Sequence, residues 1–240
     1  MVTFCFLLPA MLIHADFSRR AAVLPDQYQW IRSPQGGVER VMLDRIGTEK
    51  ARATSIVRYA PGSYFPAHFH PGGEEILVLS GTFSEDQCHY PAGSYLRSPP
   101  GSSHQPFSRE GAVIFVKLRQ MPPDERHNVR LDTHDPARWI RRAGGERCPL
   151  FTRHTEQVTL ERIGPGQPLF EATVNGGAEL LILEGGLREA ATAYPRGSWL
   201  RFPADDCPAL LAGPNGVTVY LKTGHLGAAL GPHQAAEDLA

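Results

Sequence analysis

The feature that most constrains the fold of this chain is an internal repeat. The segment PGSYFPAHFHPGGEEILVLSGTF, residues 61–83, aligns without a gap with PGQPLFEATVNGGAELLILEGGL, residues 165–187, at a constant offset of 104. The same register continues through YPAGSYLRSPPG at 90–101 and YPRGSWLRFPAD at 194–205. A repeat of this length marks two copies of one structural unit, so we expect two similar domains.

Each unit has the pattern of short antiparallel strands. The 24 Gly and 21 Pro interrupt short runs of Val, Ile, Leu, Phe and Tyr, and turn signals recur at the spacing of a β-sandwich or barrel. The sequence predicts an all-β chain without long helices. In the first unit we expect strands near 52–59, 64–70, 74–80, 88–90, 94–98, 104–107 and 112–119, with counterparts in the second.

One group of polar residues in the first unit has the character of a metal site. His68 and His70 are one residue apart, so on a strand they project from the same face. The PGG at 71–73 predicts a tight reversal that returns Glu74 beside them, and a later strand and Pro-Gly turn end on His104. Three imidazoles and a carboxylate suit a first-row divalent metal ion.

The spacing of these residues resembles the two sequence motifs of the cupin family. GSYFPAHFHPGGEEILVLSG at 62–81 fits the first motif, and GSYLRSPPGSSH at 93–104 fits the second, although Ser108 stands where many cupins have Asn. The resemblance implies two tandem jelly-roll (RmlC-like) cupin barrels, a bicupin. It also implies one divalent metal ion per chain, zinc or iron first, with manganese, nickel and copper as alternatives. The metal ligands it assigns are His68, His70, Glu74 and His104.

The second unit lacks this donor set. The four ligand positions are occupied, at the same offset, by Ala172, Val174, Ala178 and Pro208. Because these side chains do not coordinate metals, we expect a degenerate, metal-free barrel that packs on the first. Glu171 and Glu179 remain near the lost site, and we expect them to be surface residues.

The repeat and its flanks give a domain division. We expect an N-terminal extension at 1–13, a metal-binding barrel at 14–125, a linker at 126–147, a metal-free barrel at 148–228 and a tail at 229–240. The opening MVTFCFLLPAMLI has no basic residue before its apolar run and is too short to span a bilayer. We therefore expect the natural start to be Met11.

Charge and cysteine usage restrict the partners and the compartment. The 24 basic and 25 acidic residues are mixed along the chain and give a net charge of −1, so we expect no binding to nucleic acid or to a membrane. The four cysteines Cys5, Cys88, Cys148 and Cys207 form no CxxC pair, which favours a reduced compartment, the cytoplasm.

Several segments resemble more closely the ChrR-type cupins, over most of residues 14–226. They are ADFSRR, GVERVMLDRIG, ARATSIVRYAPGS, GGEEILVLSGTF, YPAGSYLRSPPGSSH and IFVKLRQ. The prototype of that group is an anti-sigma factor in which a cupin domain is joined to a small helical zinc domain that holds the sigma factor. The His-x3-Cys-x2-Cys cluster of that helical domain does not occur in this sequence, so sigma-factor binding is not carried over.

Two functions remain open. In the first, the protein is a metal-dependent oxidoreductase of the dioxygenase type, because four protein ligands leave two octahedral positions for a small organic substrate and dioxygen. In the second, it is a ChrR-like zinc-binding sensor or transcription-regulatory module without catalysis, because the same ligands can close a tetrahedral zinc site. Either way we expect a small molecule in the first barrel, and exposed barrel edges allow a homodimer.

Four further residues are candidates for substrate binding. Tyr64 shares strand parity with the first histidine, Arg97 could hold a carboxylate through its planar guanidinium, and Phe115 and Lys117 alternate on a late strand. Arg97 and Lys117 both recur in the metal-free unit, which favours a structural role for them. Glu75 points away from the ligand set by strand parity, and we expect it to form hydrogen bonds at the hairpin.

Overall fold

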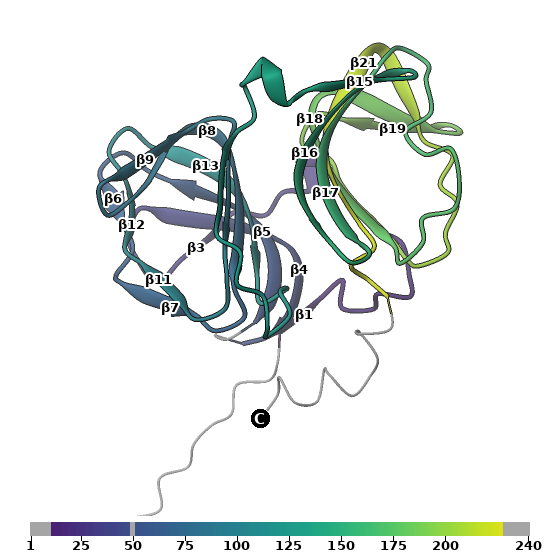
Figure 1. Ribbon diagram of the computed structural model, residues 1–240. Coiled ribbons are helices and arrows are strands. Elements are labelled where there is room, and N and C mark those ends of the chain that lie inside the picture. Colours follow the sequence, from purple (N-terminus) through teal and green to yellow (C-terminus); the bar gives the residue numbers. More distant parts are fainter. Residues whose placement is uncertain (1–10, 49–50, 228–240) are drawn as a thin grey trace, which may run out of the picture.

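The computed structural model describes residues 11–48 and 51–227, which form two β-barrels lying side by side (Figure 1). The two-barrel, all-β fold predicted from the repeat is confirmed. In the described ranges the only helical elements are the 3-10 turns η1 (Pro25–Gln27) and η2 (Pro136–Arg138). The predicted extension before Met11, Cys5 and the tail at 229–240 lie outside the described residues.

The first barrel is built on a long antiparallel sheet in the order β1-β4-β5-β13-β8-β10-β14, to which a separate two-stranded sheet, β7 with β11, is added. Its strands are β1 (Met11–Ile13), β3 (Ile31–Arg32), β4 (Val38–Gly47), β5 (Arg52–Tyr59), β6 (Ser63–Tyr64), β7 (His68–His70), β8 (Glu74–Glu85), β9 (Cys88–Pro91), β10 (Ser94–Ser98), β11 (Ser102–His104), β12 (Pro106–Ser108), β13 (Ala112–Leu118) and β14 (Val129–Asp132).

The second barrel repeats this arrangement in the order β15-β16-β17-β21-β18-β20-β2. Its strands are β2 (Ala21–Val23), β15 (Ile140–Arg142), β16 (Gly145–Arg153), β17 (Glu156–Ile163), β18 (Ala178–Glu189), β19 (Thr192–Pro195), β20 (Trp199–Phe202) and β21 (Leu211–Thr223).

Four strands differ from the domain division expected from the repeat. β1 lies in the predicted extension at 1–13 but pairs with β4 of the first barrel, and β15 lies in the predicted linker but pairs with β16 of the second. β2 lies between β1 and β3 in the chain, inside the segment predicted for the first barrel, but pairs with β20 of the second barrel. β14 lies inside the predicted linker at 126–147 but pairs with β10 of the first barrel. Edge strands expose unpaired backbone groups, and here β14 covers β10 in the first sheet and β2 covers β20 in the second. The segment predicted as a linker is therefore part of the fold.

The strand predicted to end at residue 80 runs on to Glu85 as β8. Gly81, which reads as a turn signal in the sequence, has φ +69°, and a Cβ atom there would lie 2.0 Å from the carbonyl oxygen of Gly111. Its counterpart Gly185 has φ +68°, and a Cβ atom would lie 2.2 Å from the carbonyl oxygen of Gly216. Both barrels need glycine here because two backbones approach closely at a bend within the strand.

The two barrels share one apolar core. Phe115 of the first barrel and Tyr220 of the second belong to the same buried cluster, with ring centroids 5.1 Å apart and the rings edge to face. Aromatic pairs in this arrangement contribute about 0.5–1.5 kcal/mol beyond the area they bury. The second barrel therefore packs on the first, as expected.

Charged residues inside this interface pair reciprocally. Lys222 Nζ of the second barrel donates to Glu75 Oε2 of the first at 2.7 Å. Lys117 Nζ of the first barrel donates to Glu179 Oε1 of the second at 2.5 Å. All four side chains are at most 3% exposed. Removing one member of such a buried pair costs about 3–5 kcal/mol because its partner keeps an uncompensated charge.

This pairing corrects two expectations about glutamates. Glu179 is fully buried rather than at the surface. Glu75 binds Lys222 of the other barrel rather than only groups at its own hairpin. It also accepts a hydrogen bond from Arg97 of its own barrel at 2.9 Å. Burial alone would raise the pKa of Glu75, but the charges of Lys222 and Arg97 outweigh it and lower the pKa to about 2.

Two other sequence expectations concern membranes and thiols. In the described part of the chain, no helix has the length and apolar character to cross a membrane. The three cysteines that the structure describes, Cys88, Cys148 and Cys207, are free thiols.

Candidate metal centre

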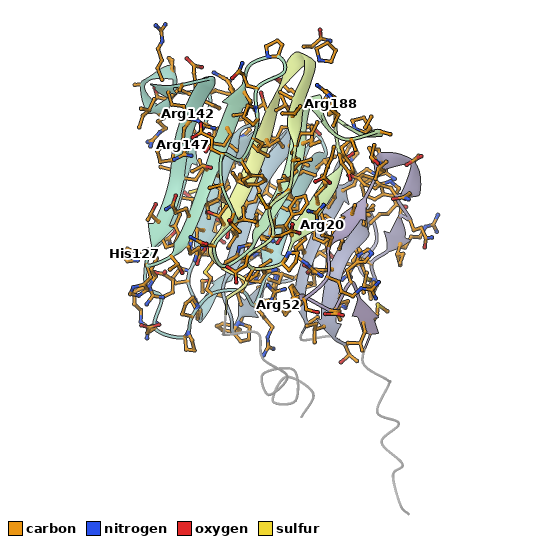
Figure 2. All side chains as sticks on the ribbon, turned by 90° about the vertical axis from the view of Figure 1, so that its right-hand side faces the viewer. Arg20, Arg52, His127, Arg142, Arg147 and Arg188 are labelled. Carbon is orange, nitrogen blue, oxygen red and sulfur yellow. The ribbon has the colours of Figure 1, made fainter. Side chains whose placement is uncertain are left out.

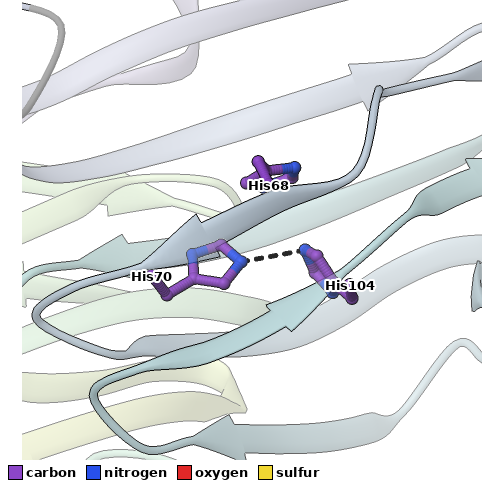
Figure 3. Close-up of side chains that lie close together, drawn as sticks. All are labelled: His68, His70 and His104. Carbon is purple, nitrogen blue, oxygen red and sulfur yellow. Dashed lines mark hydrogen bonds between the residues drawn. The ribbon is translucent and has the colours of Figure 1, made fainter.

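Two short strands bring the histidines of the first barrel together. β7 and β11 pair antiparallel, with His68 opposite His104 and His70 opposite Ser102. Since side chains alternate across a strand, His68 and His70 share the face on which His104 also lies. Figure 3 shows the three imidazoles turned toward one another from the two strands.

The donor atoms of the three histidines converge. One ring nitrogen from each of His68, His70 and His104 lies within 4.8 Å of the other two. The Nε2 atoms of His70 and His104 are 3.0 Å apart (Figure 3). After the turn, in which the Gly73 amide donates to the His70 carbonyl, Glu74 Oε2 lies 3.5 Å from both of these Nε2 atoms. The structure thus brings together all four residues predicted as ligands.

These separations fit ligands of a single ion. Two donors at about 2.1 Å from a metal, with a bond angle between about 90° and 110°, lie about 3.0–3.4 Å apart. The distances of 3.0 Å between His70 and His104, and of 3.5 Å from Glu74 to each, are close to that range. His68 is the most exposed of the three histidines, and its Nδ1–H donates to the carbonyl of Pro66 at 2.8 Å, which leaves Nε2 with a free lone pair.

Burial controls the charge of the cluster. Desolvation lowers the pKa of His70 to about 3, so its imidazole is neutral and can act as a ligand at neutral pH. Desolvation also raises the pKa of Glu74 to about 7, because the opposing charges of His104 and Arg130 offset only part of its effect. For His104, burial opposes protonation, but the hydrogen bond to Glu85 and the charge of Glu74 outweigh it and raise the pKa.

Two residues outside the ligand set, Glu85 and Arg130, hold His104 in place. Sequence reasoning missed both of them. Nδ1–H of His104 donates to Glu85 Oε2 at 2.6 Å, and Arg130 donates to Glu85 Oε1 at 2.8 Å. Burial works against the charge of Glu85, but these two partners lower its pKa to about 2. Glu85 lay beyond the predicted end of its strand and Arg130 lay in the predicted linker, so no sequence signal connected them with the site.

A cavity of about 700 Å³ adjoins the histidines. Its apolar lining includes Val57, Phe65, Phe69, Ile114 and Val116, and its polar lining includes Arg40, Arg45 and Tyr59. Burial raises the pKa of Tyr59, so its hydroxyl stays protonated. Sequence reasoning did not single out these three polar residues. The signal that could have found Tyr59 is the alternation along β5, where every second residue from Ala53 to Tyr59 lines the cavity. Arg40 and Arg45 lie on the neighbouring strand β4.

None of the four residues predicted to bind substrate lines this cavity. Tyr64 is 52% exposed on β6. Phe115 and Lys117 are on the face of β13 that contacts the second barrel, whereas their neighbours Ile114 and Val116 face the cavity. Arg97 is buried between the barrels, with ion pairs to Glu75 and Glu156. The interpretation that the recurring Arg97 and Lys117 are structural agrees with these positions.

Comparisons with known proteins agree with this architecture. Residues 18–122 match the family model of the ChrR cupin-like domain. A comparison with curated protein sequences gives no match.

Among solved structures, a candidate dioxygenase from Nostoc punctiforme PCC 73102 superposes with a TM-score of 0.67 and 15% identity, covering 93% of this chain and 86% of the other. The bacterial pirin YhhW from Escherichia coli, in complex with nickel(II), gives a TM-score of 0.65 and 10% identity over 85% and 98% of the two chains. A deletion mutant of Bacillus subtilis oxalate decarboxylase gives 0.61 and 13% over 85% and 76%. At these identities the likeness shows the fold alone. Residues 18–122 thus match the ChrR cupin-like family model, and the chain as a whole has the two-barrel cupin fold.

Proposed function

We propose that this protein is a metal-dependent oxidoreductase of the dioxygenase type that acts on a small organic substrate in the first barrel. The observation that carries the proposal is the convergence of three histidine donors at the wall of a cavity of about 700 Å³. Cavities of about 300–1,000 Å³ are the size that holds small molecules. The candidate dioxygenase and the nickel-bound pirin among the structural neighbours are consistent with it.

In this proposal His68, His70 and His104, with Glu74, hold one divalent ion. An ion bound there supplies Lewis-acid or redox chemistry. The donor set of imidazoles and one carboxylate suits iron, nickel, copper, manganese or zinc.

The chain itself would bind and orient the substrate. Arg40 donates one N–H to Ser33 Oγ at 3.1 Å, and a guanidinium has five donors, so others can bind a substrate carboxylate. The protonated hydroxyl of Tyr59 can donate to a carbonyl or hydroxyl oxygen. The apolar side chains around them, such as Phe65, offer a surface on which the apolar part of a substrate can pack. We therefore propose a small oxygenated acid, such as a keto acid or a phenolic acid, as the substrate class.

Oxygen consumption tests the proposal. The protein is purified under nitrogen, loaded with Fe(II), Mn(II), Ni(II), Cu(II) or Zn(II) in turn, and mixed with small keto and phenolic acids in an oxygen electrode. We expect substrate-dependent oxygen uptake with at least one redox-active metal and none with zinc. The His104→Ala variant should lose the uptake, and His134→Ala, which removes a histidine that is 67% exposed and outside the cluster, should keep it. No uptake with any metal, or equal uptake in His104→Ala, would contradict the proposal.

A further inference from the structure

We propose that the second barrel, although it lacks the histidines, is a separate binding site for a small organic carboxylate. It contains a cavity of about 760 Å³, within the size range that holds small molecules. Ala172 and Val174, which stand at the positions of His68 and His70, line this cavity. The second barrel therefore keeps the hollow of the first.

Polar residues have been gained on a different wall of this cavity. At the repeat offset of 104, Glu161 of β17 stands where the first barrel has the apolar Val57. After one inserted residue, at an offset of 105 that also matches Lys117 with Lys222, Thr223 of β21 occupies the position of Leu118. A barrel that has lost its metal site and has no other ligand to bind gains stability by filling its hollow. A retained hollow with new polar groups points to a ligand.

Glu161 forms one connected cluster with polar side chains of its own and neighbouring strands. Glu161 is fully buried, and its Oε1 accepts hydrogen bonds from Arg147 Nε at 2.5 Å and from Thr159 Oγ1 at 3.0 Å. Its Oε2 lies 2.8 Å from a terminal nitrogen of Arg142. In Figure 2, which looks onto the second barrel, Arg142 and Arg147 lie near each other on its strands.

Two guanidinium groups thus share one carboxylate, which leaves one positive charge in the cluster. Each arginine has further N–H donors besides those on Glu161. Nε of Arg142 is buried and has no hydrogen-bond partner among the described residues. Glu171, the other acidic residue of the lining, is exposed, so solvent screens its charge. The cluster can therefore accept one more anionic group.

The chemistry of the lining defines the ligand class. The planar fork of an arginine matches the two oxygens of a carboxylate. The rest of the lining includes the apolar side chains Leu169, Phe170, Val174 and Leu221. The ligand that suits both parts is a monocarboxylic acid with a small apolar body.

Isothermal titration calorimetry with benzoate and hexanoate tests the site in the full-length His104→Ala variant, in which the metal cluster of the first barrel is disabled. Benzamide, the neutral counterpart of benzoate, is the ligand control. We expect a benzoate site that persists in Arg40→Gln, which removes the carboxylate donor proposed for the first barrel, and at least tenfold weaker binding of benzamide. Arg142→Gln and Arg147→Gln should each weaken benzoate binding about tenfold or more, and Arg188→Gln, at an exposed arginine of the same barrel outside the cavity, should leave it unchanged.

Glu161→Gln should strengthen benzoate binding, whereas the arginine variants should weaken it. It removes the carboxylate that competes for the two guanidinium groups, so benzoate should bind several-fold more tightly, an effect that a purely structural Glu161 would not produce. This variant also keeps the test decisive if an arginine variant fails to fold. Failure of both acids to bind, equal binding of benzoate and benzamide, or unchanged binding in the Arg142, Arg147 and Glu161 variants would overturn the proposal. The metal site of the first barrel takes no part in any of these outcomes.

Discussion

Glu85 Oε2 accepts a hydrogen bond from Nδ1–H of His104 at 2.6 Å, while Nε2 of the same imidazole lies 3.0 Å from His70 Nε2. The carboxylate therefore fixes the tautomer of His104, with the proton on Nδ1 and the lone pair of Nε2 directed into the cluster. Contacts of this kind orient metal-binding histidines and raise their basicity.

Replacing this carboxylate should weaken metal binding. In Glu85→Gln the charge that holds the His104 proton is lost, and we expect a 10–100-fold lower metal affinity, the usual effect of changing a partner of a metal-binding histidine. Competition with a chromophoric chelator measures it. Glu189→Gln, the same change at the equivalent position of the second barrel, is the matched control and should leave the affinity unchanged. Equal affinities in Glu85→Gln and the unmodified protein would show that Glu85 does not orient His104.

The interface lysine Lys222 should contribute strongly to stability. Its ammonium donates to Glu75 and lies 3.0 Å from Glu156, so Lys222→Met leaves two buried carboxylates short of a cation. We expect the free energy of unfolding to fall by about 3–5 kcal/mol in urea titrations. Adding Glu75→Gln to this variant should recover part of the loss, because it removes one of the uncompensated charges. If the double variant loses as much unfolding free energy as the two single variants together, Lys222 and Glu75 are not energetically coupled.

Acid should destabilise the protein through the same interface. The pKa of Glu75 is lowered from 4.5 to about 2, so the unfolded chain binds a proton at this group more readily than the folded chain does. The contribution of Glu75 is therefore fully present above about pH 4.5 and is lost as the pH falls toward 2. Urea titrations at pH 6, 4 and 3 should show this loss, and it should be smaller in Glu75→Gln. An unfolding free energy that stays constant between pH 6 and 3 would contradict the predicted loss of stability in acid.

Features that depend on local pattern could be predicted from the sequence. The repeat predicts two barrels because residues 61–101 and 165–205 align at one constant offset of 104, so that turn and strand positions match throughout. Strand parity and the glycine turn place His68, His70 and Glu74 on one side of a hairpin, and the structure brings them within reach of His104. These relations join residues that are close in the sequence, or residues at equivalent positions of the two repeat copies.

Features that depend on packing between distant segments could not be predicted. The sequence leaves open which face of β13 lines the cavity. Contact with the second barrel places Phe115 and Lys117 on the opposite face. Arg130 reaches Glu85 across 45 residues of sequence because β14 pairs back onto β10, and the sequence between them has no signal for that pairing.

The most direct test of the account is the metal content of the protein purified without added metal and under nitrogen, beside His68→Ala and the control His134→Ala. Elemental analysis should find about one divalent first-row metal ion per chain in the unmodified protein and in His134→Ala, and a large loss in His68→Ala. No metal in the unmodified protein, or the same content in all three, would contradict a metal centre at His68, His70 and His104.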